Sequence, residues 1–280
     1  LFPYTTLFRS HLDGDMSELI WAPEIHYIDK KWYIYFAAAP NKEVTGITFN
    51  HRMYVIECLD ADPLTGTWTE KGQIKTGWES FSLDATILQH KGKLYYIWAQ
   101  EDRNVNYESH SNIYIAEMEN PWTLRTKPVM LTQPLLDWEI KIFWVNEGPA
   151  ILKKNGKIFL TYSASATDEN YCMGMLVVNE NDDLLDPKSW KKLEKPVFKT
   201  SYKNKQYGPG HNSFTVSEDG MKDLLVYHAR NYTDIEGDPL YDPNRHTRVQ
   251  VIEWDKDGFP IFGEPVMDTR NVDFDSLRKK

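Results

Sequence analysis

The sequence predicts an all-β fold built from repeated small antiparallel sheets. Four segments share a polar or acidic entry, a short apolar run, a turn, and a second run of aromatic and β-branched residues. No amphipathic helix is evident between them. The four segments are WAPEIHYIDKKWYIYFAA (Trp21–Ala38), LDATILQHKGKLYYIWAQ (Leu83–Gln100), NEGPAILKKNGKIFLTYSAS (Asn146–Ser165) and GHNSFTVSEDGMKDLLVYHAR (Gly210–Arg230).

The segments recur at a nearly constant interval. Their second runs follow Lys31, Lys93, Lys157 and Asp223, at steps of 62, 64 and 66 residues. Small sheets repeated at such a period are typical of propeller blades. The turns of a two-sheet sandwich, the main alternative, would not recur at this interval. We therefore predict about four blades.

Each unit contains the signals of about four strands. The turns HKGK, KNGK and SEDGM carry glycine where a hairpin needs a positive φ. The runs Trp32–Phe36 and Leu94–Trp98 favour strands. Third strands are expected at Met53–Cys58, Ile113–Ala116, Met173–Val178 and Val249–Glu253. Trp68, Trp122 and Trp190 close three units, where we expect them to pack between blades.

The first ten residues are expected to differ in origin from the rest, the alternative being a native edge strand. Leu1–Ser10, LFPYTTLFRS, resembles the translation of a sequencing adapter, so we expect a foreign segment at residues 1–10 and an incomplete propeller at residues 11–280. By extrapolation of the repeat, a fifth unit would begin upstream of Leu1. The alternative is a complete four-bladed propeller.

Composition excludes several classes of protein. No apolar run approaches the ~20 residues that a membrane helix needs. The formal net charge of −9 disfavours a nucleic-acid binder. Two cysteines, Cys58 and Cys172, cannot alone form a disulfide framework or a four-ligand zinc site. We therefore expect neither a membrane nor a nucleic-acid partner.

The residues that open the units are chemically unusual. Asp84, Glu147 and His211 open the second, third and fourth units, and the first strands of a propeller line its channel. Each carboxylate alone is typical of a turn, but burying unpaired charges is costly. Converging carboxylates suit glycoside hydrolysis. Around them in the sequence lie Trp21, Trp138, Phe143, Trp144 and Arg230.

Several of these segments resemble glycoside hydrolase family 43. They are WAPEIHYIDKKWYIYFAA, SLDATIL, VNEGPAIL, TYSASATDENYCMGML and YGPGHNSFTVSEDG, and the likeness covers about residues 16–265. VNEGPAIL, GPGHNSF and ENYCMGM resemble the α-L-arabinofuranosidase branch. The resemblance implies a five-bladed propeller whose first blade is missing here.

The implied activity is that of an inverting, exo-acting α-L-arabinofuranosidase that releases arabinose from arabinan or arabino-oligosaccharides. The alternatives within the family are a β-D-xylosidase and an endo-arabinanase. Alternatives of another class are a non-catalytic carbohydrate-binding propeller and a protein-interaction propeller. An extracellular or periplasmic location is favoured, and the partner is an arabinose-containing polysaccharide or oligosaccharide.

The resemblance also implies catalytic roles. Glu147 in NEGP matches the general acid, and Asp84 in LDAT matches the residue that orients the acid and tunes its pKa. The general base is an Asp of the first blade, in an Arg-Ala-Asp-Pro-like segment that this chain lacks. Asp13 and Asp15 match the linker after that blade. We therefore assign no general base and expect the chain as given to be inactive.

Four residues are implicated in binding. Trp21 and Trp144 are pocket platforms or blade packing, and Arg230 in YHAR matches a position that reaches the sugar. His211 matches a central histidine that contacts substrate or lies near a calcium or sodium ion. Since calcium prefers 6–8 oxygen ligands, waters would supply most of them. The alternative is a hydrogen-bonded channel histidine without a metal, and no cofactor is required.

Overall fold

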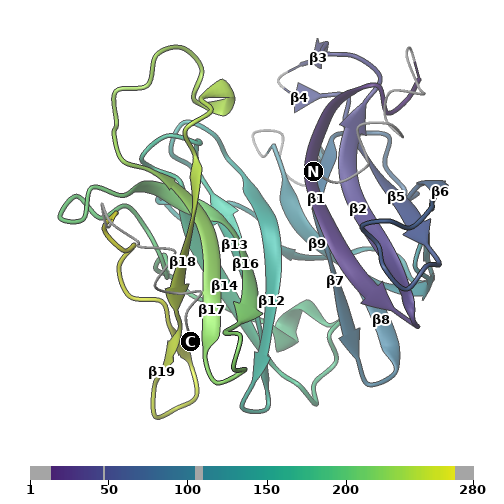
Figure 1. Cartoon of the computed structure of the whole chain (residues 1–280). Coiled ribbons are helices and arrows are strands. Elements are labelled where there is room, and N and C mark those ends of the chain that lie inside the picture. The colour runs from purple at the N-terminus through teal and green to yellow at the C-terminus, as the bar shows by residue number, and fades with distance from the viewer. Residues whose placement is uncertain (1–13, 47, 105–109, 269–280) are drawn as a thin grey trace.

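The computed structural model describes residues 14–46, 48–104 and 110–268 (Figure 1). Their regular structure is almost entirely β-strand, with the short 3-10 turns η1 (Pro187–Ser189) and η2 (Pro239–Tyr241). The all-β prediction is confirmed. The predicted foreign segment Leu1–Ser10, Asp13 and the tail from Thr269 lie outside the described residues.

The first two sheets follow one another along the chain. The first has the order β1–β2–β5–β6, and the hairpin β3–β4 lies apart from it. Their bounds are β1 (Glu18–Ile28), β2 (Lys31–Ala39), β3 (Val44–Thr45), β4 (Thr48–Phe49), β5 (Arg52–Cys58) and β6 (Trp68–Gln73). The second sheet contains β7 (Ser82–His90), β8 (Lys93–Gln100), β9 (Asn112–Asn120), β10 (Thr123–Leu124) and β11 (Val129–Thr132), with β10 and β11 both paired to β9.

The third and fourth sheets repeat this order. The third contains β12 (Asn146–Lys154), β13 (Lys157–Ala164), β14 (Cys172–Asn179) and β15 (Lys191–Lys192). The fourth contains β16 (Tyr207–Val216), β17 (Asp223–Arg230) and β18 (His246–Val251). Within the described residues it has three strands rather than the expected four. The reason is that β19 (Glu253–Trp254) folds back onto β20 (Pro260–Ile261) through a turn at Gly258 instead of extending the sheet.

Tight turns connect the first two strands of three sheets. Both central residues have a positive φ in Asp29-Lys30, Lys91-Gly92 and Asn155-Gly156. This geometry matches the right-handed twist of the flanking strands, which explains why Gly, Asn and Asp occur there. The predicted hairpins are confirmed.

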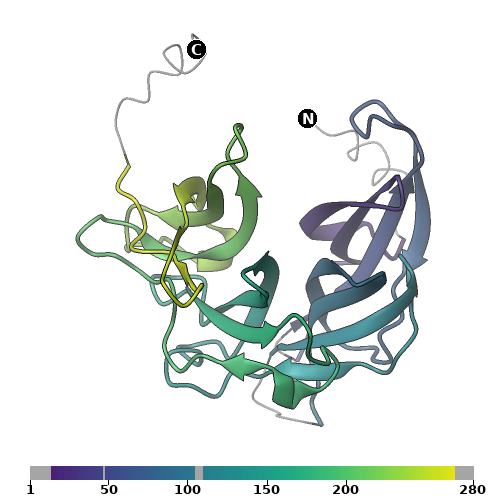
Figure 2. The same cartoon turned by 90° about the horizontal axis from the view of Figure 1, so that it is seen from below.

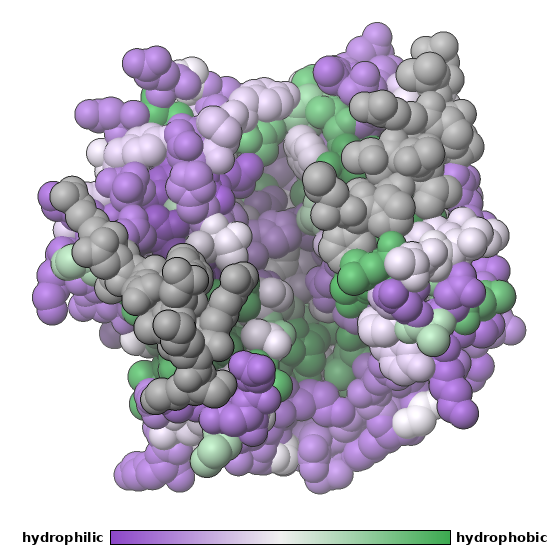
Figure 3. Space-filling model, viewed as in Figure 1, coloured by the Kyte–Doolittle hydropathy of each residue, from purple (hydrophilic) through white to green (hydrophobic). Residues whose placement is uncertain are grey.

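The four sheets are arranged around an axis as propeller blades. Figure 2 shows them as an arc, with β1, β7, β12 and β16 innermost and an opening between the first and fourth sheets. The space-filling view is hollowed between these two sheets (Figure 3). The prediction of about four blades is confirmed. No helix among the described residues has the length and apolar character needed to cross a membrane.

The core lies between the blades. One buried cluster joins the first three sheets and contains Tyr35, Trp98 and Leu160, while a second joins the third and fourth sheets through Phe159 and Tyr227. Two of the three closing tryptophans contribute to such packing. The Trp122 ring lies 6.4 Å from that of Tyr33 in the first sheet, and Trp190 belongs to the first cluster. The expectation for Trp68 is wrong within the described residues, because Trp68 packs against a face of its own sheet rather than between two blades.

Candidate active site

Each innermost strand carries a β-bulge at the same level of the channel. In each bulge the inner strand has one residue more than the strand it pairs with. The bulges lie between Trp21 and Glu24, Leu83 and Thr86, Glu147 and Ala150, and Gly210 and Ser213. The first residue inside each bulge has a positive φ: Ala22 at 45°, Asp84 at 53°, Gly148 at 54° and His211 at 46°. Bulges re-aim side chains. Asp84 and His211 therefore occupy equivalent places, and Glu147 precedes that place by one residue.

Asp84 is buried beside the third and fourth sheets. Its Oδ2 accepts a hydrogen bond of 3.0 Å from the Gly148 N–H and lies 3.8 Å from Nδ1 of His211. Burial raises the pKa of Asp84, while His211 and the Gly148 hydrogen bond act in the opposite direction. These two partners stabilise the carboxylate form. The structure thus supplies Asp84 with specific partners for a negative charge.

Glu147 lies one residue before Gly148 on β12 and is half-buried. Its Oε1 accepts a hydrogen bond of 2.7 Å from the Tyr171 hydroxyl. Burial and, next, the charge of Asp84 raise the pKa of Glu147 to about 7. A carboxyl group with such a pKa keeps its proton near neutral pH, as a general acid requires.

The two carboxyl groups lie close enough for the charge of Asp84 to raise the pKa of Glu147. Asp84 has the N–H of Gly148 and the His211 ring as partners for its charge, whereas burial and the charge of Asp84 favour the protonated form of Glu147. Sequence reasoning placed both residues in the channel, and the structure brings them together. Their individual roles stay predictions.

His211 lies beside Asp84 and beside Gly148, the residue that follows Glu147. Its backbone N–H donates to Oγ of Ser163 at 2.7 Å. A Cβ added to Gly148 would lie 3.4 Å from Cγ of His211, so glycine lets the imidazole approach the strand closely. Among the described residues, no three His, Cys, Asp or Glu side chains form a group that could hold a metal ion. This donor set does not fit a metal held by protein ligands. An ion held through waters stays a prediction, and no catalytic step is derived from it.

Trp21 stands at the place on β1 that corresponds to Glu147 on β12. Its ring centroid lies 4.1 Å from that of His51 and 5.4 Å from that of Phe49. Nε2 of His51 is 2.8 Å from the Leu19 carbonyl oxygen, and burial lowers the pKa of His51 to about 4. A neutral histidine thus packs against the Trp21 ring.

The other two predicted binding residues are Arg230 and Trp144. Arg230 is buried, and it donates to the carbonyl oxygens of Thr167 and Pro239 and pairs with Asp242 at 3.2 Å. Its guanidinium therefore ties loops of the third and fourth sheets together. Trp144 is half-buried just before β12. The substrate-binding roles of both residues stay predictions.

Sequence reasoning missed three residues that act on the pair. Tyr171 contacts Glu147 from the loop before β14. Glu24 raises the pKa of Asp84 and accepts a hydrogen bond of 2.6 Å from Thr86. Arg245, in the loop before β18, favours the charged forms of both carboxyl groups. Tyr171 and Glu24 belong to the segments ENYCMGM and WAPE, whereas Arg245 has no such signal.

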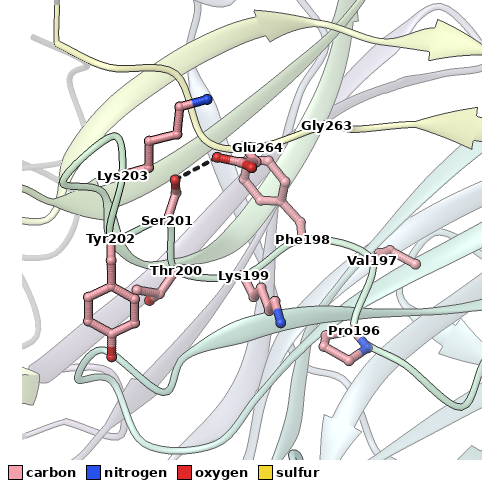
Figure 4. Close-up of a pocket in the computed structure, with 10 residues that line it drawn as sticks. All are labelled: Pro196, Val197, Phe198, Lys199, Thr200, Ser201, Tyr202, Lys203, Gly263 and Glu264. Carbon is pink, nitrogen blue, oxygen red and sulfur yellow. Dashed lines mark hydrogen bonds between the residues drawn. The ribbon is translucent and has the colours of Figure 1, made fainter.

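A separate hollow of about 400 Å³ lies outside this site. It is formed by residues 196–203 with Gly263 and Glu264, and Ser201 donates to Glu264 across it at 2.8 Å (Figure 4). None of the predicted site residues lines it.

Comparison with known proteins identifies the family. The sequence profile of glycosyl hydrolases family 43 matches residues 4–260. The chain belongs to glycosyl hydrolase family 43. The crystal structure of a family relative, an α-L-arabinofuranosidase from Lactobacillus brevis, has a TM-score of 0.91 and 63% identity, covering 93% of this chain and 80% of that one.

Curated relatives of this family 43 chain have related names. An "Extracellular exo-alpha-(1->5)-L-arabinofuranosidase" from Streptomyces avermitilis is 56% identical over 266 residues, which are 95% of this chain and 54% of the relative. "Alpha-L-arabinofuranosidase 43" from Humicola insolens is 51% identical over the same shares. This chain therefore spans about half the length of these two relatives.

Proposed function

We propose that the chain belongs to an inverting, exo-acting α-L-arabinofuranosidase, with Glu147 as general acid and Asp84 as the residue that orients it and tunes its pKa. The observation that carries this proposal is the carboxyl pair in the channel, in which Asp84 helps to raise the pKa of Glu147 to about 7. The names of the relatives support arabinose as the sugar that is released. The substrate would be an arabinose-containing polysaccharide or oligosaccharide. The name of the Streptomyces relative supports an extracellular location.

The proposed chemistry is proton transfer to the leaving oxygen. Glu147 donates its proton to the glycosidic oxygen as the bond to the anomeric carbon breaks. Asp84 keeps that proton on Glu147 until substrate binds, since a second negative charge beside it is unfavourable. Trp21 offers a flat apolar face at the level of Glu147. Each of these residues acts on the reaction from a different blade.

Inversion also needs a general base to activate water on the opposite face of the sugar. We assign this role to none of the described residues. The expectation therefore stands that the 280-residue chain hydrolyses arabinosides no faster than its Glu147→Gln variant. Loss of a positioned base costs about 10²–10⁴-fold in rate.

Azide provides the first test, because it attacks carbon without needing deprotonation. With α-1,5-arabinobiose and azide, the chain should form arabinofuranosyl azide and release arabinose, as Glu147 protonates the departing sugar oxygen. Mass spectrometry would detect both products. Glu147→Gln should lose this reaction, whereas Glu119→Gln, a matched change outside the channel, should not. Equal product from Glu147→Gln would refute the acid assignment.

The choice of sugar is tested with two chromogenic substrates. In the presence of azide, a nitrophenyl α-L-arabinofuranoside should react faster than a nitrophenyl β-D-xyloside. Faster reaction of the xyloside would favour the β-D-xylosidase alternative. Binding of arabinobiose without any azide product would instead favour a non-catalytic carbohydrate-binding propeller.

A further inference from the structure

Tyr171 is the closest described hydrogen-bond donor to the proposed acid. It is almost fully buried, and its hydroxyl lies 2.7 Å from Oε1 of Glu147. Burial, followed by the charges of Glu147 and Asp84, raises the pKa of Tyr171 well above its ordinary value. The phenol therefore stays protonated and donates to the carboxyl group.

Two residues of the fourth sheet fix the position of the Tyr171 ring. A Cβ added to Gly210 would lie 2.5 Å from Cε1 of Tyr171, so only glycine leaves room for the ring. The His228 ring stacks on Tyr171 with centroids 5.6 Å apart and planes inclined by 11°. Gly210 and His228 are themselves cross-strand partners on β16 and β17.

Ser163 links the surroundings of Tyr171 to the fourth sheet. Its hydroxyl favours the phenolate form of Tyr171 and so acts to lower the pKa of that residue, and its Oγ accepts from the His211 backbone N–H at 2.7 Å. Ser163 is also the cross-strand partner of Glu147. Tyr171 thus lies between one residue pair of the third sheet and one of the fourth.

We propose that Tyr171 is a positioning residue for the acid: its hydroxyl donates a hydrogen bond to Oε1 of Glu147, so that the transferable proton is carried by Oε2. A carboxylic acid has one protonated oxygen, and the oxygen that accepts the phenol hydrogen bond is the unprotonated one. The orientation of the acid then depends on how the third and fourth sheets hold the Tyr171 ring. This inference rests on the proposed function of Glu147.

The direction of the effect follows from the groups that face Glu147. Asp84 of the second sheet opposes ionisation, whereas Tyr171, His211 and Arg245 favour it. The phenol hydrogen bond stabilises the carboxylate form. Tyr171→Phe keeps the ring between Gly210 and His228 and removes this donor. The pKa of Glu147 should therefore rise by about one unit, given the strength of hydrogen bonds to charged groups.

The experiment is a titration of the Glu147 carboxyl group, observed by ¹³C NMR on the full chain labelled at glutamate Cδ. The ¹³C signal that is missing from the spectrum of the Glu147→Gln variant is assigned to Glu147. In infrared spectra of the labelled protein at low pH, the Glu147 C=O band should move to higher frequency in Tyr171→Phe, because the carbonyl oxygen loses its donor. An unchanged pKa together with an unchanged band would overturn the proposal.

Two further variants separate positioning from general disturbance. Tyr33→Phe removes a matched hydroxyl that donates to Glu57 at 2.7 Å in the first sheet, and it should leave the titration of Glu147 unchanged. Gly210→Ala displaces Tyr171 without altering it and should raise the pKa of Glu147 in the same direction as Tyr171→Phe. A comparable rise in Tyr33→Phe would contradict a specific role for Tyr171.

The titration needs no turnover, so the two proposals fail separately. Lack of azide product from arabinobiose would count against the function of Glu147 but leave the pKa comparison intact. With azide as the nucleophile, Tyr171→Phe should lower kcat on arabinobiose about tenfold, the rate equivalent of one hydrogen bond of this strength, with little change in KM. An unchanged kcat with a raised KM would show that Tyr171 binds the sugar instead.

Discussion

At the scale of single residues, the site depends on which of two adjacent carboxyl groups holds a proton. Glu147 has a pKa of about 7 because burial and the Asp84 charge both oppose its ionisation. Asp84 has its own partners, the Gly148 N–H and His211. Substitutions on either residue therefore have effects whose sign can be stated in advance.

Asp84→Asn removes the negative charge beside Glu147. The pKa of Glu147 should fall, because a neutral neighbour no longer opposes ionisation. The introduced amide would retain an oxygen that can accept from Gly148. ¹³C titration of the Glu147 carboxyl group measures the shift, and an unchanged or raised pKa would contradict the assigned role of Asp84.

Glu147→Gln should stabilise the protein at alkaline pH. The folded-state pKa of about 7 exceeds the ordinary value of 4.5, so wild-type stability falls as pH rises from about 4.5 to about 7. The neutral amide of the variant has no such loss, and at pH 8 the variant should gain up to about 3 kcal/mol. Below about pH 4 this ionisation contribution should vanish. Urea unfolding across this pH range tests the prediction, and a gap independent of pH would refute it.

At the scale of elements, the bulges explain what sequence reasoning achieved and what it missed. The period of the repeat located the strands, and the polar entries located Asp84, Glu147 and His211. The bulge register was not visible, so these residues looked equivalent although Glu147 precedes the other two places by one. Tyr171 escaped notice because its role depends on Gly210 and His228, which approach it only after the third and fourth sheets pack together.

Gly148→Ala tests the bulge of the third sheet. Gly156→Ala is a matched control, since Gly156 also has a positive φ, of 72°, but a Cβ there would meet no atom within 4 Å. Each change should cost about 1–2 kcal/mol for the left-handed backbone. Gly148→Ala should in addition disturb His211 and shift the pKa of Asp84. Equal losses of stability and an equal pKa of Asp84 in both variants would show that His211 does not lie in close contact with Gly148. Chemical denaturation and carboxyl titration distinguish the cases.

At the scale of the whole molecule, the two buried clusters divide the arc unequally. One unites the first three sheets, and the other attaches the fourth sheet to the third. The fourth sheet brings His211, Gly210 and His228 to the site. Its attachment therefore determines whether the acid keeps its surroundings.

Leu225→Ala tests this attachment, because Leu225 is fully buried in the second cluster. The cavity should cost about 2–5 kcal/mol. Hydrogen exchange should accelerate in β16, β17 and β18 and stay nearly unchanged in β2 and β5. Mass spectrometry of exchanged peptides measures both regions. A uniform acceleration across all four sheets would indicate a single cooperative unit.

The repeated bulge has a consequence for how such a channel can acquire new chemistry. Each inner strand has one residue of positive φ within its bulge, while its pairing with the neighbouring strand continues on both sides. Alanine, aspartate, glycine and histidine all occupy this position in one chain. The bulge accepts different side chains on the same backbone, so a titratable group can be gained at Ala22 by a single codon change while the strand pairing of that blade is kept.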